Sequence, residues 1–284
     1  MTPRERWLAV LNRRKADRVP CDFRATPEAT QRLIEHLGVE SLDEALRRLH
    51  VDPIVDVSPR YVGPPVPPDE DVFGIRYQNT DYGIGSYRDA VYHPLAEYET
   101  VGQVEANYEW PNTDWWDYSG IPAQVEGKED CVIRGGGSEP FATYKWLRGV
   151  QRAYLDLIEN REMVHYCLGK LYDLCYQDTL RTYEAIPGKV LWTWVAEDLG
   201  TQRGLLVSLE HIEEFFLPHM KRMIDLVHSA GAFVFHHSDG AVRDNIPNMI
   251  AAGIDVLDPV QWRAEGMGRE GLKRDFGDRL VFHG

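Results

Sequence analysis

The stretch Ala232–Asp239, AFVFHHSD, is a short apolar run that ends in two histidines, a serine and an aspartate. Three other segments in the second half of the chain follow the same pattern: VLWTWVAED at 190–198, IDVLDPVQ at 254–261 and LVFHG at 280–284. Helical patterns separate these runs, so the sequence predicts buried parallel strands that alternate with helices. Polar residues that end such strands gather on one face, where (β/α) barrels keep their active sites. The pattern therefore indicates an α/β enzyme.

The first half of the chain adds strands and helix starts to this pattern. Strands are expected at 19–24, 51–57 and 131–134, which brings the total to about seven. Thr2-Pro3-Arg4-Glu5 is a capping box, and Thr26-Pro27 and Ser41 are further helix caps. The whole chain, residues 1–284, is thus predicted to be a single domain of the (β/α)8 TIM-barrel type.

Residues 58–129 interrupt the alternation, and we expect them to form an insertion between strands 2 and 3. Segments 72–77 and 86–93 predict an antiparallel hairpin, and 110–118 contains three tryptophans. This insertion either roofs a substrate at the barrel rim or packs against the outer helices.

The predicted strand count leaves the barrel incomplete. Seven strands would expose two unpaired edges, so we expect the chain to be C-terminally truncated, with the strand 8 region missing or supplied by another chain. An open sheet is the alternative.

Composition excludes several classes of protein. A hydrophobic content of 43% is typical of a folded core, and a net charge of −14 without a basic run argues against nucleic acid as a partner. No run of 18 apolar residues predicts a membrane span, and the N-terminus lacks the pattern of a signal peptide. The four cysteines form no CxxC motif, which favours reduced thiols in a cytoplasmic protein.

Histidine and acids at the predicted strand ends are the candidate site. His237 and Asp239 are two residues apart on a strand, so their side chains face the same way and can bind a divalent metal or form an acid/base pair. Asp198 and Gln202 follow the previous strand and suit catalysis or substrate positioning. Four further residues are candidates for substrate binding: Arg24, Asp258, Gln261 and His283. Each of them could instead have a purely structural role; Arg24, for example, could form an ion pair with Asp22 or Glu28.

These residues are where the chain resembles the uroporphyrinogen decarboxylase superfamily, in particular the branch that includes zinc- and corrinoid-dependent methyltransferases. The resemblance is densest in EDLGTQ at 197–202, HSDG at 237–240 and GIDVLDPVQ at 253–261. ADRVP at 16–20 and LRG at 147–149 also fit. The resemblance implies a (β/α)8 barrel whose chain continues beyond strand 7.

The resemblance implies two competing reactions. Decarboxylases of the superfamily carry Arg-Gln-Ala-Gly-Arg after strand 1, whereas this chain has Arg24-Ala25-Thr26-Pro27-Glu28 and lacks the second arginine. Methyltransferases bind zinc through His-x-Cys-Gly, and here His237 keeps the histidine while Asp239 replaces the cysteine. A carboxylate ligand leaves the metal more Lewis-acidic, which suits polarisation of an oxygen.

The sequence hypothesis is metal-assisted methyl transfer between a small substrate and a corrinoid protein. His237 and Asp239 would bind a divalent metal, with zinc favoured, and Asp198 and Gln202 would orient the substrate. The alternatives are decarboxylation of a tetrapyrrole, as in porphyrin biosynthesis, and a truncated binding module without catalytic activity. The oligomeric state stays open, with a homo-oligomer among the candidates.

Overall fold

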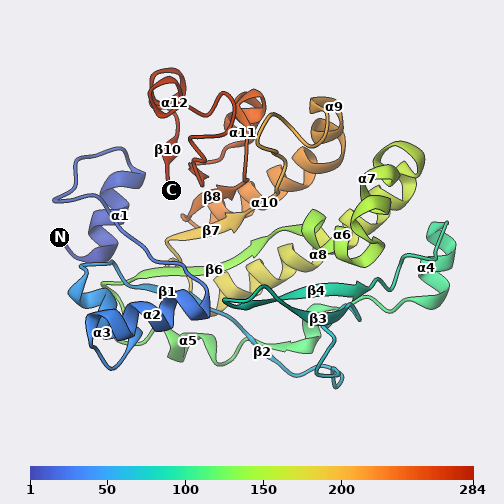
Figure 1. Cartoon of the computed structure of the whole chain (residues 1–284), viewed down its shortest axis with the longest axis horizontal. Helices are drawn as coiled ribbons and strands as arrows, with labels where there is room; N and C mark the ends of the chain where they lie inside the picture. The colour runs from blue at the N-terminus through green and yellow to red at the C-terminus, as the bar shows by residue number, and fades with distance from the viewer.

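Six parallel strands form the central sheet of the computed structural model, which describes residues 1–284. Their order is β1-β6-β7-β8-β9-β10, so strands adjacent along the chain are also adjacent in space, apart from the excursion between β1 and β6 (Figure 1). The bounds are β1 Ile54–Val57, β6 Val132–Ser138, β7 Trp192–Val195, β8 Phe233–His237, β9 Val256–Asp258 and β10 Val281–Phe282. The predicted α/β class with parallel strands is therefore confirmed.

The prediction of a strand at Val19–Arg24 is wrong. This segment forms no ladder, and its backbone meets the sheet only before β1, where Asp52 N donates to Cys21 O at 2.8 Å. Pro20 has no N–H to donate, and the N–H of Cys21 is used by the Asp52 carboxylate at 3.1 Å. The pairing therefore runs from β1 to β10 without closing, so a complete barrel is not shown.

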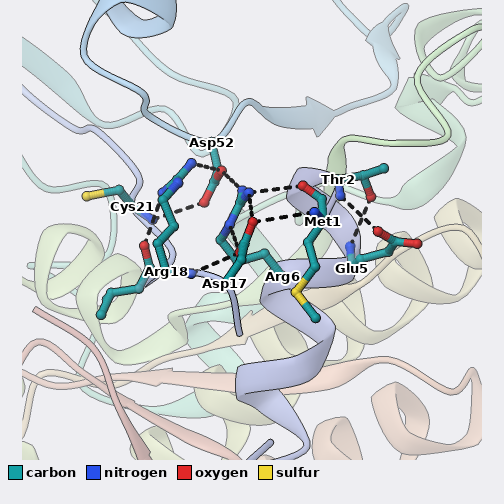
Figure 2. Close-up of polar contacts among 9 residues, drawn as sticks. Met1, Thr2, Glu5, Arg6, Asp17, Arg18, Cys21 and Asp52 are labelled. Carbon is teal, nitrogen blue, oxygen red and sulfur yellow. Dashed lines mark hydrogen bonds and ion pairs between the residues drawn. The ribbon is translucent and has the colours of Figure 1, made fainter. Parts of the chain in front are cut away.

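An ion-pair cluster holds this N-terminal segment against the sheet (Figure 2). The buried carboxylate of Asp52 pairs with the guanidinium groups of Arg6 and Arg18. Arg6 also donates to Asp17 at 2.6 Å, which links α1 (Pro3–Leu11) to the loop that follows it. This cluster fixes the start of the segment that brings Asp22 and Arg24 to the carboxyl end of the sheet.

The helices begin where the sequence places caps. The capping box of Thr2 is formed at α1, and the Thr26 and Ser41 hydroxyl groups cap α2 (Pro27–Leu37) and α3 (Leu42–Arg48). Two helices that follow β6 meet at Gly149, which has a φ of 81°. The remaining major helices are α6 Pro140–Arg148, α7 Val150–Glu159, α8 Arg161–Ala185, α10 Leu217–Ser229, α11 Ile246–Ala252 and α12 Arg269–Phe276. A three-residue helix α9 (Leu209–His211) and a π-helical segment Ile212–Phe216 precede α10.

The insertion contains the predicted hairpin, formed by β3 (Arg76–Asp81) and β4 (Ser86–Tyr92) in antiparallel pairing. It also contains β2 (Arg60–Tyr61) paired with β5 (Trp116–Asp117), and the short helices α4 (Val101–Asn107) and α5 (Ile121–Gln124). Its aromatic part packs on α8, where Tyr118 donates to Asp178 at 2.7 Å and Trp110 contacts Tyr166 edge-on. Of the two alternatives, these contacts favour packing against an outer helix.

Aromatic side chains from α1, β7 and β8 pack together against the sheet. Trp192 and Phe235 stack with ring centroids 4.1 Å apart, and Trp7 of α1 covers both rings. Trp194 lies two residues further along β7 and therefore points to the same side, nearer the carboxyl ends of the strands. The candidate site lies beside these rings, at the carboxyl ends of the strands. None of the helices is both long and apolar enough to span a membrane.

Candidate active site

Asp198, His237 and Asp239 converge at the carboxyl ends of β7 and β8. Each contributes one potential ligand atom, and the three atoms all lie within 4.8 Å of one another. His237 Nε2 is 3.6 Å from the Asp198 carboxylate, which also accepts the backbone N–H of Asp239 at 2.8 Å. His237 and Asp239 thus share a face, as strand alternation predicts, and Asp198 joins them.

Two glycines allow the loops after β7 and β8 to meet. A Cβ on Gly200 would lie 2.3 Å from the Asp239 carbonyl oxygen, and one on Gly240 would lie 2.5 Å from the Thr201 oxygen. Gly240 also has a φ of 84°, which disfavours other residues. The backbones therefore approach closely enough for Ala241 N to donate to Thr201 O at 2.6 Å, and this contact sets the separation of Asp198 and Asp239.

The buried carboxylate of Asp258 orients His237 by contacting Nδ1, the ring nitrogen that is not directed at Asp198. His237 Nδ1 lies 3.0 Å from one Asp258 oxygen, so His237 Nε2 faces the other two acids. The second Asp258 oxygen contacts His283, whose Nε2 lies 3.1 Å from Asp22. Arg24 Nη2 also reaches Asp258, at 3.2 Å. The result is a continuous chain of alternating carboxylates and imidazoles.

Asp258 and His283, both predicted to bind a substrate, are bonded to other protein groups. The Asp258 side chain is only 1% exposed and both its oxygens have protein partners, so it supports His237. His283 is likewise bonded on both ring nitrogens. Burial raises the pKa of Asp258, but the hydrogen bonds from His237 and His283 outweigh burial and hold it well below the usual value.

Two glutamines form a second line of support. Gln261 donates to Asp239 Oδ1 at 2.6 Å and accepts the Gly240 N–H at 3.1 Å. Gln202 Nε2 donates to Gln261 at 3.1 Å and does not reach the three-residue cluster directly. Gln261 therefore orients Asp239, and Gln202, predicted to be catalytic, lies one hydrogen bond further away.

The electrostatics of the cluster favour a cation. Burial and the nearby Asp198 charge raise the pKa of Asp239. For His237, burial lowers the pKa, but Asp258 and the other acids raise it above the usual value overall. Negative charges that are held together in this way bind a divalent metal or a proton, because either one relieves their repulsion. One imidazole and two carboxylates are a suitable ligand set for such a metal.

A cavity of about 460 Å³ opens beside His237. Arg24 and Trp194 line it, together with Arg134, Ser138 and Glu139 from β6 and the turn after it. Sequence reasoning missed these last three residues: it gave Arg134 no role and ended the strand there. Because β6 continues through Gly135–Gly137 to Ser138, the polar residues on either side of these glycines could have indicated the site.

Comparison with known proteins finds similarity in structure but not in sequence. No protein-family model matches this chain, and no curated protein sequence matches it. By structure the chain is similar to a methyltransferase from Methanosarcina mazei, with a TM-score of 0.66 and 18% sequence identity, covering 100% of this chain and 82% of that one. At this identity the likeness establishes the fold alone. The uroporphyrinogen decarboxylase resemblance stays a prediction.

Proposed function

We propose that this protein is a methyltransferase that uses a divalent metal held by Asp198, His237 and Asp239 to act on a small substrate. The observation that carries the proposal is the convergence of the three ligand atoms within 4.8 Å, next to a cavity at the carboxyl ends of parallel strands. The similarity in fold to a protein named as a methyltransferase supports the reaction type.

The ligand set fits a catalytic site better than a structural one. Catalytic zinc usually has three protein ligands and one open position, and Asp198, His237 and Asp239 match that number. A bound metal would supply Lewis acidity toward the oxygen or sulfur of a substrate. Two carboxylates in place of thiolates favour an oxygen-bearing substrate.

The protein's own side chains would do the positioning. Asp258 fixes the ring of His237 through Nδ1 and leaves Nε2 for the metal. Gln261 holds one oxygen of Asp239, which leaves the other available. The cavity beside His237 would hold the substrate, and Trp194, whose ring lies 5.2 Å from that of His237, forms part of its wall.

A corrinoid protein as methyl acceptor or donor is the further part of the proposal, and it rests on the sequence resemblance. Tetrapyrrole decarboxylation is less well supported, because its arginine pair is reduced to Arg24.

The test begins with metal content. Elemental analysis of the purified protein is expected to show about one divalent metal per chain, and His237→Ala and Asp198→Asn should remove most of it. His228→Ala is the matched control, because His228 also pairs with an acid, Asp255 at 2.9 Å, but away from the cluster. Negligible metal in the unmodified protein and in all variants would exclude the proposal.

Activity is then measured as methylation of reduced free cobalamin, which stands in for a corrinoid protein. A panel of small methoxy and methylthio compounds serves as methyl donors, and the absorbance change of the cobalamin is recorded. Methylation that depends on His237 is the expected result. The metal-loaded protein is tested with every donor, first with free cobalamin and then with a protein-bound corrinoid. If neither acceptor is methylated, the proposed reaction type is wrong.

A further inference from the structure

The cavity beside His237 has hydrogen-bond donors for which the protein supplies no partner. The Ser138 hydroxyl is the clearest case, because the residue is only 6% exposed and its Oγ makes no hydrogen bond. A buried polar group left without a partner costs about 1–3 kcal/mol, so such groups are normally satisfied by protein, water or ligand. Since Ser138 lines the cavity, a ligand in the cavity can supply the acceptor.

Two guanidinium groups face the same space. Arg24 uses only Nη2, on Asp258, and Arg134 uses Nε and Nη2 on Asp56, so each retains N–H groups without a protein partner. Both lie over the Trp194 ring, with Cζ atoms 4.7 Å and 5.9 Å from its centroid. Both guanidinium groups, Trp194 and His237 therefore line the same cavity.

We infer that this cavity binds the carboxylate of the substrate through Arg24, Arg134 and Ser138. Planar guanidinium groups match the geometry of a carboxylate, and a hydroxyl donor can complete its coordination. The lining contains one acid, Glu139, whose pKa is raised by burial and by the charge of Asp198. The substrate class is thus a small carboxylic acid, with its anionic end on β6 and its other end toward His237.

The orientation of this substrate rests on the proposed function, but the anion site can be tested without it. The probes are 4-methoxybenzoate, its neutral analogue 4-methoxybenzamide and 4-methoxyphenyl phosphate, titrated calorimetrically into the protein as purified and after dialysis against a chelator. Binding of the carboxylate in both preparations, at least about 10-fold tighter than the amide, is the expected result. Equal affinities or no binding would overturn the inference, and tighter binding of the phosphate would overturn the carboxylate assignment.

The variants identify the residues responsible. Arg134→Gln should raise the Kd for the benzoate by about 10-fold or more and Ser138→Ala by about 5-fold, with little change for the amide. Arg60→Gln is the matched control, because Arg60 pairs with Asp117 on an exposed surface. Ser138→Ala should not lower the thermal stability, because its hydroxyl has no protein partner. Unchanged benzoate affinity in both variants would contradict the site.

The two proposals fail separately. Preferential binding of 4-methoxybenzoate, together with negligible metal in the purified protein, would leave the anion site standing and remove the metal-assisted reaction. Metal binding that depends on His237, together with equal affinities for 4-methoxybenzoate and the amide, would leave the metal site standing and remove the anion site.

Discussion

Asp258 supports the candidate metal ligand His237 through a partly buried hydrogen bond at 3.0 Å. Supporting carboxylates of this kind fix the tautomer and orientation of a metal-binding histidine, and their removal lowers metal affinity about 10- to 100-fold. We expect this loss in Asp258→Asn, measured by competition with a chelating dye. Asp255→Asn is the control. Asp255 immediately precedes β9, the strand that ends at Asp258, and it pairs with His228 rather than His237. Equal affinities in the two variants would show that Asp258 does not support the site.

His283 should make stability depend on pH in the alkaline range. Burial lowers its pKa, but the carboxylates of Asp22 and Asp258 raise it overall to about 9, above the unfolded value of about 6.5. The stabilisation is therefore fully present below about pH 6.5 and is lost as the pH rises through about 9, with an upper limit of about 3 kcal/mol.

Urea unfolding at pH 6.5 and pH 9.5 measures this dependence. His283→Gln should be less stable than the unmodified protein at pH 6.5 and should show a smaller decrease between the two values. His36→Gln, on the exposed surface of α2, should behave as the unmodified protein does. Parallel decreases in His283→Gln and the unmodified protein would contradict this assignment.

The convergence of His237 and Asp239 could be predicted from alternation along one strand. The role of Asp258 could not, because it depends on the register between β8 and β9, which places His237 directly opposite Asp258. Spacing within the sequence carries no information on that register. The same reason applies to His283, which reaches Asp258 from the next strand.

At the scale of the elements, Gly200 controls how closely the loops after β7 and β8 approach. In Gly200→Ala the added methyl would lie 2.3 Å from the Asp239 backbone oxygen, so the two loops must separate. Asp198 and Asp239 move with them, and we expect metal affinity to fall by at least about 10-fold, since each ligand must keep its geometry. Dye competition measures the affinity, and thermal unfolding measures the stability.

Gly169→Ala is the control for this substitution. Gly169 lies within α8, and beyond the neighbouring helix backbone a Cβ there would meet no atom within 4 Å. Alanine favours a helix over glycine by up to about 1 kcal/mol, so this variant should be at least as stable as the unmodified protein. An unchanged metal affinity in Gly200→Ala would show that the close approach is not needed for the site.

Helix starts were predictable because caps are local: Thr2, Thr26 and Ser41 each bond to the backbone three residues ahead. The strand predicted at 19–24 is wrong because an alternation of apolar and polar residues does not show what the backbone pairs with. Here the partner of the Cys21 N–H is a side chain, Asp52, rather than a neighbouring strand. Tertiary contacts therefore override the local pattern.

A buried ion pair connects the insertion to the helices beside the sheet. Arg148 and Asp156 are both fully buried and bonded to each other, and Arg148 also donates to the backbone of Tyr98 at 2.7 Å. This contact brings residue 98 of the insertion against α6 and α7. The insertion is therefore part of the packed structure, although no residue of it lines the cavity beside His237.

The N-terminal ion-pair cluster of Figure 2 holds the segment that carries Asp22 and Arg24 against the rest of the protein. Asp52 is 1% exposed and is paired with two arginines, so Asp52→Asn would leave Arg6 buried without its full counter-charge. Loss of one partner from a buried pair typically costs about 3–5 kcal/mol. We expect a destabilisation of about 3 kcal/mol, because Arg18 is partly exposed and can recover hydration.

Urea unfolding measures this cost, and hydrogen exchange locates it. The amides of residues 17–24 should exchange faster in Asp52→Asn than in Asp117→Asn, whose partner Arg60 lies on the surface. Because Arg24 belongs to the loosened segment, benzoate binding should weaken while metal binding at His237 is retained. A variant that loses both together would show that the cluster supports the whole sheet rather than this one segment.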